Sequence, residues 1–184
     1  MPLADWLHPW ASRAYRHVTD GARYHVLDLR WAGRGLDNRW NEAGEPTLYL
    51  AGDPRVVMAE FARHFEYDRA PKVGSGARAR HLYSLHVQVD QMLDLRDPNV
   101  WADLGLRNAS HCFLERPICR ATARYLRTAT PAQGLLVPSV GLLDDLERWV
   151  AVLFLERLPA DPHQFLTAVR DEGLIPGIVP PSAC

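Results

Sequence analysis

Alternating apolar and polar residues at positions 82–90, LYSLHVQVD, form the clearest pattern in the chain. A repeat of two predicts a strand with one buried face and one wetter face. Short apolar runs bounded by glycine or proline at 47–50, 134–137 and 149–155 predict more deeply buried strands. Residues 14–18 are a further strand candidate.

Three other segments predict helices. Asp53 is a suitable N-cap with Pro54 at the first helical position, so a helix is expected to run to about Glu66. Residues 118–127 are rich in Ala, Leu and Arg, and residues 163–172 end before a glycine. Strands and helices do not alternate regularly and no linker divides the chain, so we expect one mixed α+β domain over residues 1–184.

Composition and charge narrow the classes of function. The chain is 47% hydrophobic and 23% charged, which is ordinary for a folded domain. The formal charge of −1 argues against direct binding to nucleic acid or to an anionic membrane. No signal peptide or membrane-spanning run is visible, and the three cysteines lack zinc-type spacing. These features predict a cytoplasmic protein without a bound metal.

The basic residues are almost all arginine, with Lys72 the only lysine. Arginine suits bidentate contacts to phosphate, although biased genomic composition is the commoner explanation. The sequence does not match two familiar signatures of functional sites. Asn38 replaces the third glycine of a dinucleotide fingerprint begun at Gly33, and Ser139 is outside a Gly-Xaa-Ser-Xaa-Gly elbow.

Residues 39–66 combine a polar turn, a strand, a tight turn and a helix. Arg39, Trp40 and Asn41 precede the strand, Tyr49 lies on it, and Glu60 lies about two turns into the helix. A cation, an aromatic face and a carboxylate together suit a ligand with phosphates, a flat ring and a sugar. Taken singly, each has a commoner explanation: Tyr49 as core, Glu60 on a solvated helix face.

Three motifs in this order resemble the RES-domain family, named for its Arg, Glu and Ser. The first contains Arg16 in YRHV, the second runs from RWNEAG through LYLA to Glu60, and the third is GLLVPS, ending at Ser139. The resemblance covers a core at about 13–158, followed by a C-terminal helix and tail at 159–184. This chain departs from the family just before the Arg-Trp pair, where glycine is common and this chain has Asp37 and Asn38, and in the charged segment 144–148.

The resemblance implies an ADP-ribosyltransferase-like fold and toxin activity that consumes NAD as a substrate. Glu60 would stabilise the positive charge on the ribose, and Ser139 would orient the ribose or the carboxamide. Arg16 and Arg39 would hold the pyrophosphate or the adjacent ribose, and Tyr49 would pack against the nicotinamide. Trp40 and Asn41 would complete the binding set. An Xre-type antitoxin is the implied partner.

Several alternatives stay open at this point. The acceptor of the ADP-ribose could be water, phosphate or a host protein, and a silent binding protein on the same scaffold is a further reading. A homodimer is compatible with the apolar tail. The basic segment 72–80 is more readily explained as a solvated connector than as a loop over the ligand.

Overall fold

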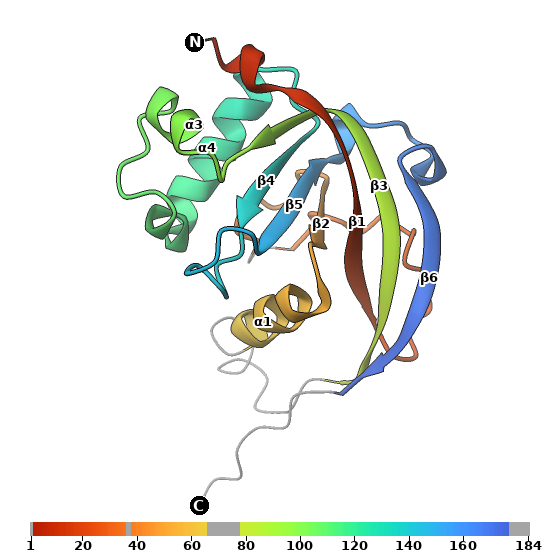
Figure 1. Cartoon of the computed structure of the whole chain (residues 1–184). Helices are drawn as coiled ribbons and strands as arrows, with labels where there is room; N and C mark the ends of the chain where they lie inside the picture. The colour runs from red at the N-terminus through yellow and green to blue at the C-terminus, as the bar shows by residue number, and fades with distance from the viewer. Residues whose placement is uncertain (1, 36–37, 66–77, 177–184) are drawn as a thin grey trace, which may run out of the picture.

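Six strands form the framework of this computed structural model, which describes residues 2–35, 38–65 and 78–176. They are β1 (His8–Thr19), β2 (Thr47–Ala51), β3 (Arg80–Asp94), β4 (Gly134–Pro138), β5 (Trp149–Phe154) and β6 (Leu166–Ile175). The hydrogen-bonded order is β1-β2-β5-β4-β3-β6, and β1 also pairs with β3. In the described part of the chain, β1 to β5 therefore close into a ring with β6 attached to β3 (Figure 1).

Helices stand outside this ring. α1 (Pro54–His64) follows β2, whereas α3 (Pro98–Asp103) and α4 (Arg116–Ala129) lie together beside β4 (Figure 1). Single 3-10 turns complete the described elements: η1 (Leu3–Trp6), η3 (His111–Leu114), η4 (Leu155–Arg157) and η5 (Pro162–Gln164). No helix within residues 2–35, 38–65 and 78–176 is long and apolar enough to cross a membrane.

The five predicted strands are confirmed. In β3, Leu85, Val87 and Val89 are buried while the intervening residues are exposed, as the alternation predicted. Every residue of β4 is buried because its two faces pack into different apolar clusters. Leu136 belongs to the cluster that includes residues of β1 and β2, and Leu135 to the cluster beneath α4. A strand covered on both faces needs a continuous apolar run rather than an alternating one.

The helix predicted from Asp53 is confirmed as α1. One carboxylate oxygen of Asp53 accepts hydrogen bonds from the amides of Arg55 at 2.7 Å and Val56 at 3.1 Å. This is the N-cap contact expected before a helix that begins with proline. The helix at 118–127 is also confirmed, within the longer α4.

The helix predicted at 163–172 is wrong, and so is the C-terminal helix at 159–184 as far as the structure describes it. This segment contains η5 and the strand β6, which pairs antiparallel with β3. Because most of β6 is exposed, its side chains carry no alternation, and backbone pairing with β3 decides its structure. Gly173 opposes Leu82 beside a shift in register, with a φ of 101°, and is not a helix C-cap.

Candidate active site

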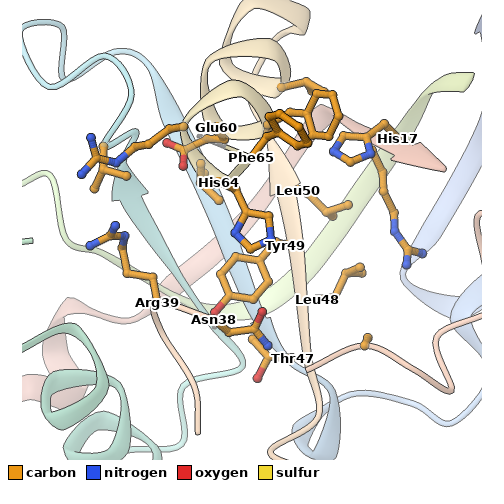
Figure 2. A pocket seen from close by; sticks show the side chains of 18 of the residues that line it. His17, Asn38, Arg39, Thr47, Leu48, Tyr49, Leu50, Glu60, His64 and Phe65 are labelled. Carbon is orange, nitrogen blue, oxygen red and sulfur yellow. The ribbon is translucent and has the colours of Figure 1, made fainter. Parts of the chain in front are cut away.

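A cavity of about 1090 Å³ opens between β1, β2 and α1 and reaches the start of α4. In Figure 2, Glu60 and Arg39 lie on one side of it, His17 on the other, and Tyr49 between them. The cavity is therefore lined by residues of the three elements that contain Arg16, the LYLA run and Glu60, which are β1, β2 and α1.

Glu60 is held at the cavity wall by two donors from the segment after β4. The hydroxyl of Ser139 donates to Glu60 Oε1 at 2.6 Å, and the amide of Gly141 donates to the same oxygen at 3.2 Å. Ser139 is fully buried and is outside the cavity lining, so it lies behind the carboxylate. At Glu60, the helix face that the sequence predicted to be solvated therefore faces the cavity.

Gly141 brings this segment against α1. A Cβ atom built at Gly141 would lie 2.9 Å from the Cβ of Ala59, closer than side chains normally approach. The missing side chain is what lets the backbone amide reach Glu60. The contact between α1 and the two donors of Glu60 therefore depends on close packing as well as on hydrogen bonds.

Arg16 and Arg39 both line the cavity, and both also bind backbone carbonyls. Arg16 donates to the carbonyl of Val26, and Nη1 of Arg39 donates to those of Phe113 at 3.0 Å and Leu114 at 2.8 Å. Burial lowers the pKa of Arg16 below its ordinary value. These anchors fix the two guanidinium groups before any ligand arrives.

Tyr49 lines the cavity and is supported from behind by Trp40 and Asn41. Its hydroxyl donates to Asn41 Oδ1 at 2.7 Å and accepts from the Trp40 amide at 3.0 Å. Burial raises the pKa of Tyr49. Trp40 and Asn41 are themselves buried and do not line the cavity, and Trp40 packs 5.1 Å from the Phe113 ring. The structure therefore places these two residues in support of Tyr49.

Sequence reasoning missed His17, which joins the cavity wall to Arg80. Arg80 Nη1 lies 3.0 Å from His17 Nδ1, and because arginine only donates, this nitrogen accepts and the proton is on Nε2. Burial, and then the charges of Arg80 and Arg16, lower the pKa of His17 to about 3. The Arg80 guanidinium also lies 4.4 Å from the centroid of the Phe61 ring. Adjacency to Arg16 was the only sequence signal for His17.

Positive charge dominates the described cavity lining. Its arginines are Arg16, Arg39, Arg63, Arg78, Arg80 and Arg116, and its carboxylates are Glu60 and Glu115. Arg78 and Arg80 belong to the basic segment 72–80, which we interpreted from the sequence as a solvated connector. Residues 66–77 lie outside the described part of the chain. Such a lining favours an anionic ligand with several phosphate oxygens. No group of three metal-ligating side chains occurs in the part of the chain that the structure describes.

The comparisons with known proteins decide the family. The model of the RES domain matches residues 8–171. The chain belongs to the RES-domain family. Among solved structures, this RES chain is similar to one in the crystal structure of the M. tuberculosis MbcT-MbcA toxin-antitoxin complex, with a TM-score of 0.62. The two are 23% identical over 90% of this chain and 86% of that chain, a likeness of fold. No curated protein matches the sequence.

Proposed function

We propose that this RES protein cleaves the nicotinamide–ribose bond of NAD. The observation that carries the proposal is the Glu60 carboxylate, held by Ser139 and Gly141 at the wall of an arginine-lined cavity. Family membership supports the same substrate. The cavity, at about 1090 Å³, lies just above the range of roughly 300–1000 Å³ that ligand-binding pockets have, so it has room for a ligand as large as a dinucleotide.

Glu60 is assigned to the charge that develops on the sugar. Nicotinamide leaves a cationic ring as a neutral molecule, so its departure needs no general acid, whereas the ribose becomes oxocarbenium-like. A fixed carboxylate beside that ribose stabilises the transition state. Both donors engage Oε1 of Glu60, and we assign Oε2 to the ribose.

Ser139 is assigned a different task from the one expected from sequence. Its hydroxyl lies behind Glu60 and donates to that carboxylate, so it orients Glu60 rather than the ribose or the carboxamide. Because Ser139 is fully buried and outside the cavity lining, its hydroxyl does not reach a ligand in the cavity, and we assign it no covalent step.

The remaining cavity residues are assigned to binding. Arg16 and Arg39 would hold the pyrophosphate by charge-assisted hydrogen bonds, since both guanidinium groups are already anchored. Tyr49 would pack against the nicotinamide ring, with Trp40 and Asn41 fixing its hydroxyl. No metal has a role in this scheme.

The biological setting is part of the proposal. The similar solved structure is a toxin-antitoxin complex, which supports a toxin with an antitoxin protein as its partner. In our proposal this toxin arrests growth by depleting NAD, and its antitoxin is of Xre type. We place the protein in the cytoplasm, where NAD is found, and include the ADP-ribosyltransferase-like relationship of the fold in the same proposal.

The test is NAD loss by purified wild-type and Glu60→Gln protein, with and without inorganic phosphate, followed by chromatography. We expect the substitution to slow NAD loss by about 10²–10³-fold, because it removes one preorganised charge. The product identifies the acceptor: ADP-ribose for water, ADP-ribose 1″-phosphate for phosphate.

Glu115→Gln is the matched control, because it removes the other carboxylate of the described cavity lining without touching the Ser139 contact. A loss below about tenfold is expected there, well short of the loss at Glu60. Wild-type turnover by Glu60→Gln would overturn the assignment of Glu60. No loss of NAD with wild-type protein would overturn NAD cleavage, and ADP-ribose found on an added protein would favour a transferase.

A further inference from the structure

The charged segment between Ser139 and β5 is tied to the start of α1. Arg148, the last residue of this segment, donates from Nη1 to Asp53 and from Nε to Asp145 at 3.1 Å. Asp53 is the N-cap of α1, the helix that carries Glu60. An ion pair therefore joins the helix to the segment that holds its catalytic carboxylate.

Asp53 serves both partners at once. Its Oδ1 accepts from the amides of Arg55 and Val56, and its Oδ2 accepts from Arg148. Burial alone would raise the pKa of Asp53, but the amide of Val56 and the Arg148 guanidinium outweigh it and the pKa is lowered. The carboxylate is thus charged at neutral pH and bridges the helix start to Arg148.

Backbone hydrogen bonds connect the Arg148–Asp53 ion pair to the segment that contains the donors of Glu60. The amide of Ser139 donates to the carbonyl of Arg148 at 2.7 Å, and the amide of Gly52 donates to the carbonyl of Trp149 at 2.9 Å. Arg148 therefore contacts the helix start through its side chain and Ser139 through its backbone. Together the two contacts hold the start of α1 against the segment that contains Ser139.

We propose that Arg148 and Asp53 are positioning residues for the reaction, which fix Glu60 against Ser139 and Gly141 without touching the substrate. The inference rests on the proposed function for its kinetic consequence only. A small displacement of a catalytic group can cost up to about 10²-fold in rate, so the link has a measurable effect.

The experiment compares Arg148→Gln and Asp53→Asn with wild-type protein. Asparagine caps helices as well as aspartate does, so Asp53→Asn removes the charge but keeps the start of α1. We expect kcat for NAD loss to fall about tenfold or more in each variant, with KM changed less than about twofold. In a Glu60→Gln background, Arg148→Gln should cause no further loss of kcat.

Hydrogen exchange at the amides of Ser139 and Gly141 gives a readout that needs no turnover. Loss of the link should speed exchange at both amides by about tenfold or more, because the segment opens more often. Arg13→Gln is the control, since it breaks the Arg13–Glu172 ion pair of 2.5 Å between β1 and β6, outside the cavity lining. It should leave kcat and both amides as in wild-type protein.

The outcomes separate the two proposals. Unchanged exchange at both amides in the two variants, or an additive kcat loss in the Glu60→Gln background, overturns the positioning role. Faster exchange at both amides, with no NAD loss even by wild-type protein, supports the link and overturns the proposed function. Should Arg148→Gln fail to fold, Asp53→Asn tests the same contact.

Discussion

The carboxylate of Glu60 owes its orientation to a buried hydroxyl and a glycine amide. A lone glutamate near the middle of a helix can adopt many rotamers, and each hydrogen bond to Oε1 removes some of them. Electrostatic catalysis depends on such preorganisation, because a charge that must first move into place stabilises the transition state less.

Removing the Ser139 hydroxyl should disturb the orientation of Glu60 while leaving the binding of NAD nearly unchanged. Ser139→Ala is expected to lower kcat for NAD loss by about 10–10²-fold with little change in KM, because Glu60 keeps its charge but loses a donor. Steady-state kinetics would show it. Ser84→Ala is the control, since Ser84 is another buried serine that donates to a carboxylate, at 2.5 Å from Glu172, and is outside the cavity lining. A wild-type kcat for Ser139→Ala would contradict the role assigned to this hydroxyl.

His17 should make the free energy of unfolding sensitive to acid. The unfolded residue takes up a proton near its ordinary pKa of about 6.5, whereas the folded residue does so only near 3. Protonation below about pH 6.5 therefore favours the unfolded chain, and the stability that His17 contributes at neutral pH is lost as the pH falls.

Between pH 7 and pH 5, wild-type protein should lose about 2 kcal/mol more stability than His17→Asn. Urea unfolding at both pH values measures the difference. Replacing the exposed His163 by glutamine should leave the wild-type pH dependence in place. Equal losses in wild-type and His17→Asn protein would show that His17 titrates alike in the folded and unfolded chains.

At the scale of elements, local signals predicted α1 and failed for β6. Asp53 and Pro54 determine where α1 begins by contacts within four residues, so the sequence contains the whole signal. β6 is an exposed edge strand whose structure depends on hydrogen bonds to β3, and its own residues carry helix-like composition. No pattern within 163–172 could reveal that pairing.

Gly141 tests how closely the segment after β4 must approach α1. Alanine there would place its Cβ 2.9 Å from Ala59 Cβ and 3.1 Å from Ala59 C, so the segment or the helix must shift. We expect Gly141→Ala to lower the free energy of unfolding by about 1–3 kcal/mol and to reduce NAD loss. At Gly35 the nearest described atom to an added Cβ would be Oδ1 of the flexible Asn38 side chain at 3.4 Å, an ordinary van der Waals contact, so Gly35→Ala should change neither denaturant unfolding nor activity.

At the scale of the whole molecule, the closed ring sets which parts open first. β4 and β5 lie between two apolar clusters, whereas β6 borders the ring at one edge and is largely exposed. Amides of β4 and β5 should therefore exchange only on global unfolding, and those of β6 through smaller openings at lower free energy. Native-state hydrogen exchange in low denaturant measures both. Equal protection in β5 and β6 would mean that the ring and its edge strand unfold as one unit.

The same scale limits what the sequence could predict about the site. The motifs pointed to Arg16, Glu60 and Ser139, but not that Ser139 lies behind Glu60, since that contact joins residues 79 positions apart. Trp40 and Asn41 looked like ligand contacts because they stand next to Arg39, yet both are buried behind Tyr49. His17 and Arg80 meet only because β1 pairs with β3. Side-chain direction and long-range pairing are decided by tertiary structure.

The separation of Glu60 from Ser139 along the chain also has a consequence in time. A ribosome that has just made Glu60 must add 79 more residues before its hydroxyl partner exists, which takes roughly 4–16 s at ordinary rates of synthesis. By the end of that interval the nascent chain contains the carboxylate, α1 and the six arginines of the described cavity lining, but not the donors that orient Glu60. Under the proposed function, we therefore expect chains that end before Ser139 to cleave NAD far more slowly than chains that contain it.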